Sequence, residues 1–279
     1  MDFRTEIGPV GHSFGITHDD GIVLLGSCFA DNIGSLLADS GFDVVHNPGG
    51  PLYNPASLLY FLQGKESEPV LHEGVWHCLD MASRFQDTDR DRLMERVHAV
   101  REEFRRALDR ASVLIVTFGT ARIWTRADHI VANCHKLPDS QFRTVDLNVE
   151  EIEWEWTRAL SDMDKKIIFT LSPVRYPSYG LAGDSLSKAI LRVAIDRICR
   201  HVGADYFPAY EILTSDLRDY RFYADDMKHP SPLAVNYIYE IFRNTYFDEP
   251  TRRRGADCRR QARAAAHRPI IDDNETFTL

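Results

Sequence analysis

The chain has 279 residues, of which 44% are hydrophobic, so it is long enough to bury the core of one large domain or two small ones. A formal net charge of −9 argues against nucleic acid as the main partner, and no apolar run approaches the roughly 20 residues needed to span a bilayer. Five scattered cysteines without a CxxC pair, and a first stretch without the apolar core of a signal peptide, indicate a soluble cytoplasmic protein with reduced thiols.

Short apolar runs alternate with helical patterns along most of the chain. We expect strands at 22–25, 42–45, 112–118, 167–171 and 205–207, and helices at 30–40, from 55, at 88–110 and near 149–163, 185–202 and 232–246. Strands that alternate with helices are typical of βαβ units and a parallel sheet. The pattern therefore predicts one doubly wound α/β domain over residues 1–250, with insertions near 64–87 and 122–148.

The C-terminal segment 251–279 differs from the rest of the chain in charge. It carries seven arginines against four acidic residues, whereas the chain as a whole is acidic. Contact with RNA or anionic lipid is one interpretation of such an Arg-rich tail. A solvated, frayed terminal helix is the simpler interpretation, and we expect no nucleic-acid partner.

Ser185 is a first candidate for the nucleophile of a hydrolase. It lies in the string GDSL at 183–186, the four letters that name a large esterase class. However, a loop precedes Ser185, so no strand would hold its hydroxyl at the rim of a sheet. Asp184 and Ser185 are better interpreted as a helix start, with one of them as the cap.

Ser27 is the better candidate because of its position. It follows the predicted strand at 22–25 and Gly26, where the chain turns into a helix. Ligands of doubly wound sheets bind at the carboxyl ends of the strands, and the hydroxyl would point out of the strand end there. Backbone N–H groups of the helix start would face a developing oxyanion. The alternative is that Ser27 only caps the helix.

A base for Ser27 is available near the other end of the chain. Asp226 lies three residues before His229, close enough along one turn to accept the imidazole N–H and fix its tautomer. The pair follows the last predicted strand, so we expect it at the same rim of the sheet as Ser27. A surface Asp–His pair without a catalytic role is the alternative.

Several strings in one order resemble the GSCFA family of the SGNH hydrolase superfamily. They are GSCFA at 26–30, NPGGPLYNP at 47–55, FGTARIW at 118–124, VANCHKLP at 131–138, SPVR at 172–175, SK at 187–188, YFPAYEI at 206–212 and LRDYRFYADDMKHPS at 217–231. The resemblance implies a three-layer α/β/α, flavodoxin-like fold with a central parallel sheet of about five strands. It also implies esterase chemistry, with Ser27 as nucleophile, Asp226 and His229 as its partners, and the Ser27 N–H in the oxyanion hole.

The other oxyanion donors of the superfamily are harder to assign to residues of this sequence. A glycine after the second strand fits Gly50, with Gly49 as a close rival. An asparagine normally ends a GxN string after the third strand, but this chain has Ala121 there, and an alanine side chain cannot donate. Asn133 is the candidate substitute, carried to the site by the insertion at 122–148.

Other polar residues near the predicted strand ends could bind substrate or react. Arg175 and Lys188 could clamp a carboxylate or a phosphate, although ordinary ion pairing explains them equally well. Cys28 adjoins the predicted nucleophile, but its side chain should point away from it. The His–Cys pairs at 77–78 and 134–135 lack the spacing of zinc ligands, so we expect no metal and no other cofactor.

Together these features predict a serine esterase that removes a small, acetyl-like O-acyl group through an acyl-enzyme. A carbohydrate is the expected carrier by analogy with the superfamily. An O-acyltransferase with the same triad is one alternative. A catalytically weak glycan-binding module is another, and the missing GxN asparagine favours it. The expected partner is thus a small-molecule or glycan acyl ester, and nothing in the sequence indicates an oligomeric state.

Overall fold

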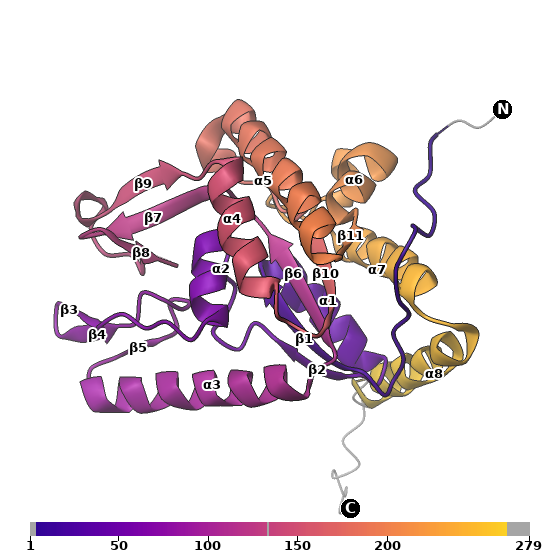
Figure 1. Ribbon diagram of the computed structural model, residues 1–279, viewed down its shortest axis with the longest axis horizontal. Coiled ribbons are helices and arrows are strands. Elements are labelled where there is room, and N and C mark those ends of the chain that lie inside the picture. Colours follow the sequence, from indigo (N-terminus) through magenta and orange to yellow (C-terminus); the bar gives the residue numbers. More distant parts are fainter. Residues whose placement is uncertain (1–3, 133, 267–279) are drawn as a thin grey trace, which may run out of the picture.

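The computed structural model describes residues 4–132 and 134–266, and its centre is a five-stranded parallel sheet (Figure 1). The sheet follows the spatial order β2-β1-β6-β10-β11. Counted along the chain, this is the 2-1-3-4-5 order of flavodoxin-like folds. The predicted α/β class and the parallel sheet of five strands are confirmed. The strands are β1 (Gly21–Gly26), β2 (Asp43–His46), β6 (Val113–Phe118), β10 (Lys166–Leu171) and β11 (Asp205–Phe207).

Alternate residues of each central strand point to opposite faces, and both faces are apolar. In β1, Val23 and Leu25 belong to one core cluster, whereas Ile22 and Leu24 belong to the other. Because helices cover both clusters, the strands are continuous hydrophobic runs rather than alternating patterns (Figure 1). The first cluster packs against α2 (Pro55–Leu62), α3 (Arg90–Arg110), α4 (Val149–Leu160) and α5 (Gly180–Val202), and the second against α1 (Cys28–Asp39) and α7 (Pro232–Tyr246).

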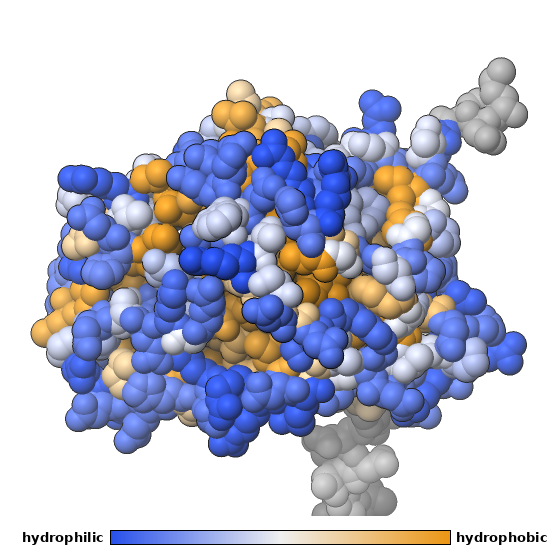
Figure 2. All heavy atoms as spheres, in the orientation of Figure 1, coloured by the Kyte–Doolittle hydropathy of each residue, from blue (hydrophilic) through white to orange (hydrophobic). Residues whose placement is uncertain are grey.

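Helix α3 illustrates how this layer separates the core from solvent. Its buried side chains Leu93, Val97 and Phe104 recur at helical spacing and face the sheet. Its other positions are mostly charged, and Figure 2 shows a hydrophilic band along this helix with more apolar residues next to it. The amphipathic pattern in the sequence thus translates directly into one layer of the fold.

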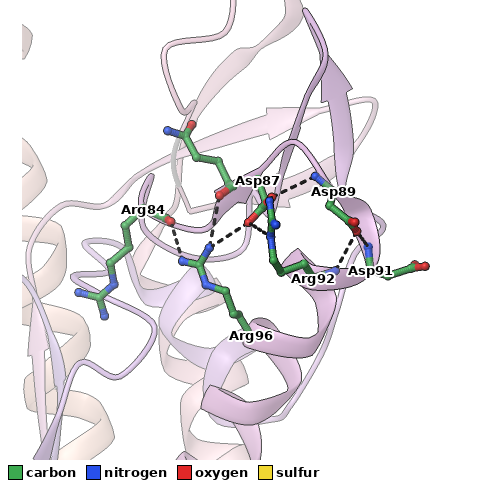
Figure 3. A network of polar contacts seen from close by, with 7 residues as sticks. Arg84, Asp87, Asp89, Asp91, Arg92 and Arg96 are labelled. Atoms are coloured by element: carbon green, nitrogen blue, oxygen red, sulfur yellow. Dashed lines mark hydrogen bonds and ion pairs between the residues drawn. The ribbon is translucent and has the colours of Figure 1, made fainter.

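The start of α3 is tied to the preceding strand β5 (Gln86–Asp87) by charged groups (Figure 3). Asp89 caps the helix by accepting the N–H groups of Asp91 and Arg92 at 2.9 and 3.1 Å. The carboxylate of Asp87 pairs with the guanidinium groups of Arg92 and Arg96. The helix therefore begins two residues later than predicted, at the point where a cap is available.

Two small antiparallel sheets occupy the predicted insertions. They are joined by a hydrogen bond of 2.8 Å from Ala132 N–H to Leu79 O, and by an apolar cluster that includes Leu79 and Val131. They lie together beside the main sheet (Figure 1). One contains β3 (Val70–His72), β4 (Val75–His77) and β5, and the other contains β7 (Arg122–Arg126), β8 (His129–Val131) and β9 (Arg143–Asp146).

The helix that contains the GDSL string begins earlier than predicted. It starts at Gly180, whose φ of 68° follows the short 3-10 turn Pro177–Tyr179. Glycine adopts this conformation without strain, so the chain can turn into the helix at this point. The predicted start was therefore wrong: Asp184 and Ser185 lie inside the helix, and neither caps it. Ser185 is exposed to solvent.

The last described helix, α8 (Glu249–Ala266), packs against α1 (Figure 1). Thr251 on this helix is buried, and a Cβ added to Gly255 would lie 3.5 Å from Ser40 Cβ. The first part of the arginine-rich segment is thus packed on the domain, whereas residues 261–265 are mostly exposed. Among those residues, no helix combines the length and the apolar character required to cross a membrane.

Candidate active site

Ser27 lies at a sharp turn between β1 and α1. The preceding Gly26 has a φ of 153° and approaches β6 so closely that a Cβ there would lie 2.6 Å from Thr117 Cβ. Ser27 is the N-cap of α1, and its Oγ accepts the N–H of Phe29 at 3.3 Å. Ser27 therefore does cap the helix, and its hydroxyl also lies at the carboxyl end of a central strand, where ligands of such sheets bind.

Asn47, directly after β2, holds this turn in place. Its Oδ1 accepts the N–H of Gly26 at 2.8 Å, and its Nδ2 donates to Asp31 Oδ1 at 2.9 Å and to Ser27 O at 3.3 Å. The side chain is buried, and the residue has a φ of 40°, which asparagine tolerates better than most residues. Asn47 thus fixes the backbone on both sides of the Gly26–Ser27 peptide.

The hydroxyl of Ser27 meets a second serine rather than solvent. Ser172 directly follows β10, its Oγ lies 2.8 Å from Ser27 Oγ, and both residues are fully buried. The register of the sheet explains this contact, since Thr117 of β6 pairs with Gly26 on one side and with Thr170 on the other. The hydroxyl that was expected to point out of the strand end is therefore enclosed rather than open to solvent.

Asp226 and His229 form the close pair that their spacing predicts. Asp226 Oδ2 lies 2.6 Å from His229 Nδ1, and Oδ1 accepts the N–H groups of His229 and Lys228 at 3.0 and 2.9 Å. These bonds, led by the His229 N–H, hold the pKa of Asp226 well below its usual range, so it remains a carboxylate. The pair is accessible, with 40% of the His229 side chain exposed.

The loop that carries this pair is attached to the loop after β10. Arg175, three residues after Ser172, donates its N–H to Lys228 O at 3.0 Å. The Gly26–Ser27 turn, which contacts Ser172, and the Asp226–His229 pair therefore lie at the same rim of the sheet. Among the described residues, however, no hydrogen bond joins His229 to Ser27. The structure places the three predicted triad residues at one edge of the sheet, but His229 and Ser27 are not in hydrogen-bond contact.

The predicted oxyanion donors are only partly supported. Gly50 N–H donates to Asn47 O at 2.7 Å and closes a turn, so it is not free for an oxyanion and this assignment is corrected. Gly49 N–H, its rival, donates no hydrogen bond within the described part of the chain. Asn133 lies outside the described residues.

The Ser187–Lys188 pair on α5 holds the chain where β6 ends. Ser187 Oγ accepts the N–H of Ala121 at 2.8 Å, and Lys188 Nζ donates to Gly119 O at 2.7 Å and to Ser172 O at 2.8 Å. Only 2% of Lys188 is exposed, so a substrate anion cannot reach its amine, and the predicted clamp is corrected to a link between strand ends. Burial lowers the pKa of Lys188 to about 7.

Arg175, the other predicted clamp, lies against aromatic side chains. Its guanidinium is 4.3 Å from the centre of the Tyr223 ring, and Nη1 donates to Tyr220 Oη at 3.2 Å. Within residues 4–132 and 134–266, no carboxylate forms an ion pair with Arg175. A role in binding an anionic substrate group therefore stays a prediction.

The side chain of Cys28 faces a different neighbour from that of Ser27, in line with the expectation that the two point apart. Its Sγ lies 3.6 Å from Tyr53 Oη. Burial is the main cause that raises the pKa of this thiol, despite its position at the start of a helix. Cys28 is thus mainly protonated at neutral pH, which makes it a poor rival to Ser27.

Sequence reasoning missed three residues of this site: Asn47, Ser172 and Ser187. A signal existed for each, because they begin the strings NPGGPLYNP, SPVR and SK that support the family resemblance. These strings mark the residues as family features but do not give their roles. Each side chain binds groups on a different segment of the chain, and such long-range contacts leave no pattern in the local sequence.

The profile of the GSCFA family matches residues 21–242, a range that includes every site residue described above. One similar solved structure is that of a protein from Slackia heliotrinireducens whose assignment as an SGNH hydrolase is provisional. It is 14% identical, with a TM-score of 0.44, and the alignment covers 80% of this chain and 97% of that chain. No curated protein matches the sequence.

Proposed function

The chain belongs to the GSCFA family, and we propose that it is a serine esterase that removes a small O-acyl group, such as acetyl, from a carbohydrate. Ser27 is the nucleophile, His229 is the general base, and Asp226 orients the base. The carbohydrate carrier is an analogy with the SGNH superfamily.

The observation that carries this proposal is the geometry of Asp226 and His229. A carboxylate at Nδ1 fixes the imidazole tautomer in which Nε2 is free to accept a proton, and it stabilises the imidazolium that forms. The pair is attached, through Arg175 and Lys228, to the loop that contacts Ser27. An isolated surface pair would have no such link to a strand-end serine.

The reaction follows from these positions. Ser27 Oγ attacks the acyl carbon while its proton passes to His229 Nε2, and the carbonyl oxygen becomes an oxyanion near the N–H groups at the start of α1. His229 then returns the proton to the leaving sugar oxygen, which leaves the acyl group on Ser27. A water molecule, activated by His229, releases the acyl group as a carboxylic acid.

Substrate binding has to open the site before this chemistry begins. Ser27 is fully buried, whereas the Asp226–His229 pair is exposed on a loop. The loop at 224–230 therefore has to move toward the nucleophile. An enclosed serine can accept a small acyl group more easily than a long acyl chain. Acetyl is therefore the acyl group that we expect the enzyme to remove.

The central test is turnover of a chromogenic acetate ester, together with labelling by a fluorophosphonate. Ser27→Ala should abolish both, whereas Ser185→Ala is the matched control because that serine is exposed in the second turn of α5. Loss of activity in a folded Ser185→Ala protein, or labelling that persists in Ser27→Ala, would refute the proposal.

The burial of Ser27 also favours a second candidate, an O-acyltransferase. The same acyl-enzyme passes its acyl group to a sugar hydroxyl when water is kept out, and a fully buried nucleophile excludes water. Adding a sugar acceptor to the acetate ester assay distinguishes the two. A transferase releases the chromophore faster with the acceptor present and forms an acetylated sugar, whereas an esterase forms acetate at an unchanged rate.

A further inference from the structure

Ser172 occupies the position next to the reacting atom of the proposed nucleophile. Its Oγ lies 2.8 Å from Ser27 Oγ, and neither residue is exposed. Each of the two oxygens also accepts a backbone N–H at 3.3 Å, Ser27 Oγ from Phe29 and Ser172 Oγ from Val174. The two hydroxyls are thus held against each other by the backbone on both sides.

The hydrogen atoms available at this contact determine which of the two hydroxyls is the hydrogen-bond donor during the reaction. Each hydroxyl has one hydrogen, and only one of the two can lie between the oxygens. In the described part of the chain, Ser172 Oγ has no acceptor other than Ser27 Oγ for its hydrogen. If Ser27 gives its own hydrogen to a base, the Ser172 hydrogen is the one that lies between them.

We propose that Ser172 is a further catalytic residue, which donates its hydroxyl hydrogen to Ser27 Oγ and stabilises the negative charge that develops there during attack. This inference rests on the proposed function, in which Ser27 is the nucleophile. As the Ser27 proton moves to His229, the lone pair that accepted the longer Phe29 N–H bond forms the Oγ–C bond, and Ser172 keeps its own proton throughout. A hydrogen bond to a charged oxygen is stronger than one between neutral hydroxyls, so the contact favours the transition state over the resting state.

Lys188 is the positioning residue for Ser172. Its amine donates to the carbonyl oxygens of Ser172 and Gly119 and so connects the residues that follow β10 and β6. A neutral amine has two N–H donors and an ammonium has three, so either form can hold both carbonyls. The position of Ser172 should therefore not change with pH around neutrality, although burial lowers the pKa of Lys188 to about 7.

The test compares Ser172→Ala with Ser172→Thr, in which the donor is kept. We expect Ser172→Ala to lower kcat for the acetate ester and the rate of fluorophosphonate labelling of Ser27 by about tenfold to hundredfold, with little change in KM. Ser172→Thr should restore most of that loss. A residue that only supports the turn to Val174 would lower the melting temperature and leave kcat of the folded protein unchanged.

The outcomes separate this inference from the function on which it rests. If wild-type Ser27 is labelled and Ser172→Ala reacts at the wild-type rate, the role of Ser172 is refuted and the esterase stands. If wild-type Ser27 neither turns over the ester nor reacts with the fluorophosphonate, both are refuted. Should Ser172→Ala not fold, Ser172→Cys decides, because its S–H is a weaker donor: a wild-type labelling rate in that variant overturns the proposal.

Discussion

The two halves of the proposed site are held in opposite ways. Ser27 is buried and fixed by partners that are distant in sequence: Asn47 through the backbone of its turn, and Ser172 through its hydroxyl. Asp226 and His229 are about 40% exposed, and the bonds that orient their side chains all lie within four consecutive residues. One half depends on the assembled sheet, and the other depends on a single turn.

This difference indicates which half is able to move. Displacing Ser27 would break hydrogen bonds to three segments in a buried environment, where unsatisfied polar groups are costly. Displacing the Asp226–His229 pair as a unit keeps its internal bonds, and the residues at 218–221 and 225–228, before and around the pair, are exposed. In the proposed mechanism, Ser27 is therefore the fixed reference, and His229 is brought to it when substrate binds.

The largest effect should follow from the internal bond of the mobile half. Asp226→Asn keeps an oxygen for the backbone N–H groups of Lys228 and His229, but its amide favours the wrong imidazole tautomer. We expect kcat to fall by up to about 10⁴-fold in a folded protein, by analogy with the serine protease triad. The plateau of a pH–rate profile for the acetate ester measures this loss.

Asp225→Asn is the matched control for that experiment. Asp225 adjoins Asp226, but among the described residues it makes no hydrogen bond or ion pair, so its substitution should leave the plateau of the pH–rate profile unchanged. Equal losses of kcat in both variants would mean that removal of any negative charge from this loop lowers activity, rather than loss of the Asp226–His229 contact. The distinction between a local catalytic pair and an ordinary acidic loop would then disappear.

Substitution of Asn47 in the fixed half should lower both stability and kcat, with a smaller loss of kcat than in Asp226→Asn. Asn47→Ala leaves the Gly26 N–H without its partner and removes one of the two partners of Asp31, which keeps His46 at 3.0 Å, so the free energy of unfolding should fall by about 2 kcal/mol. Because the same bonds set the direction of Ser27, kcat should also fall, by about tenfold or more.

Asn54→Ala separates the two consequences of losing Asn47. Asn54 is also buried, but its side chain only caps α2 through Ser57 N–H at 2.8 Å. Its loss should cost about 1 kcal/mol of stability and leave kcat unchanged. Chemical denaturation and steady-state kinetics of both variants measure this. If Asn47→Ala is less stable yet fully active, the turn does not depend on Asn47 for its catalytic geometry.

The same contrast explains which features could be predicted from sequence. The strand at 112–118 is apolar and bounded by turns, and it appears as β6 at Val113–Phe118. The contact of Asp226 with His229 spans one turn and is encoded by spacing alone. The contact of Ser27 with Ser172 joins residues 145 positions apart and depends on the register of three strands, which no local pattern contains.

Two errors have a more local cause, in backbone conformation. The start of α5 depends on Gly180 and the turn at Gly50 on a φ of 83°, and in both cases a glycine adopts a conformation that other residues rarely reach. A glycine in the sequence indicates that the backbone can adopt a positive φ at that position, but it does not predict whether it does. The Gly50 N–H is consumed by that turn, so its assignment as a donor failed although its position after β2 was right.

A pH-dependent effect on stability should come from Lys188 in the fixed half. Its pKa falls from the ordinary 10.5 to about 7 on burial, so between these pH values the unfolded chain binds more protons than the folded one. The free energy of unfolding of the wild type should therefore rise with pH across this window, relative to Lys188→Met. Denaturation of both proteins from pH 6 to 10 measures it, and Lys65→Met, an exposed lysine, is the control. A constant difference across that range would mean that Lys188 stays protonated in the fold.

The smallest effect is expected at Cys28, the residue next to the proposed nucleophile Ser27 in the same turn. Although the two are adjacent, Ser27 Oγ faces Ser172, whereas Cys28 Sγ faces Tyr53 Oη at 3.6 Å. Burial raises the pKa of the thiol, so its thiolate is scarce at neutral pH and it should react slowly with iodoacetamide. Cys28→Ala should keep kcat within about twofold, because no bond to the serine is lost, and should reduce stability by roughly 1 kcal/mol. Peptide mapping of alkylated protein, with ester turnover measured in parallel, tests both points. Loss of turnover in step with alkylation of Cys28, or an inactive but folded Cys28→Ala protein, would assign the nucleophile to the thiol and reverse the roles of the two neighbours.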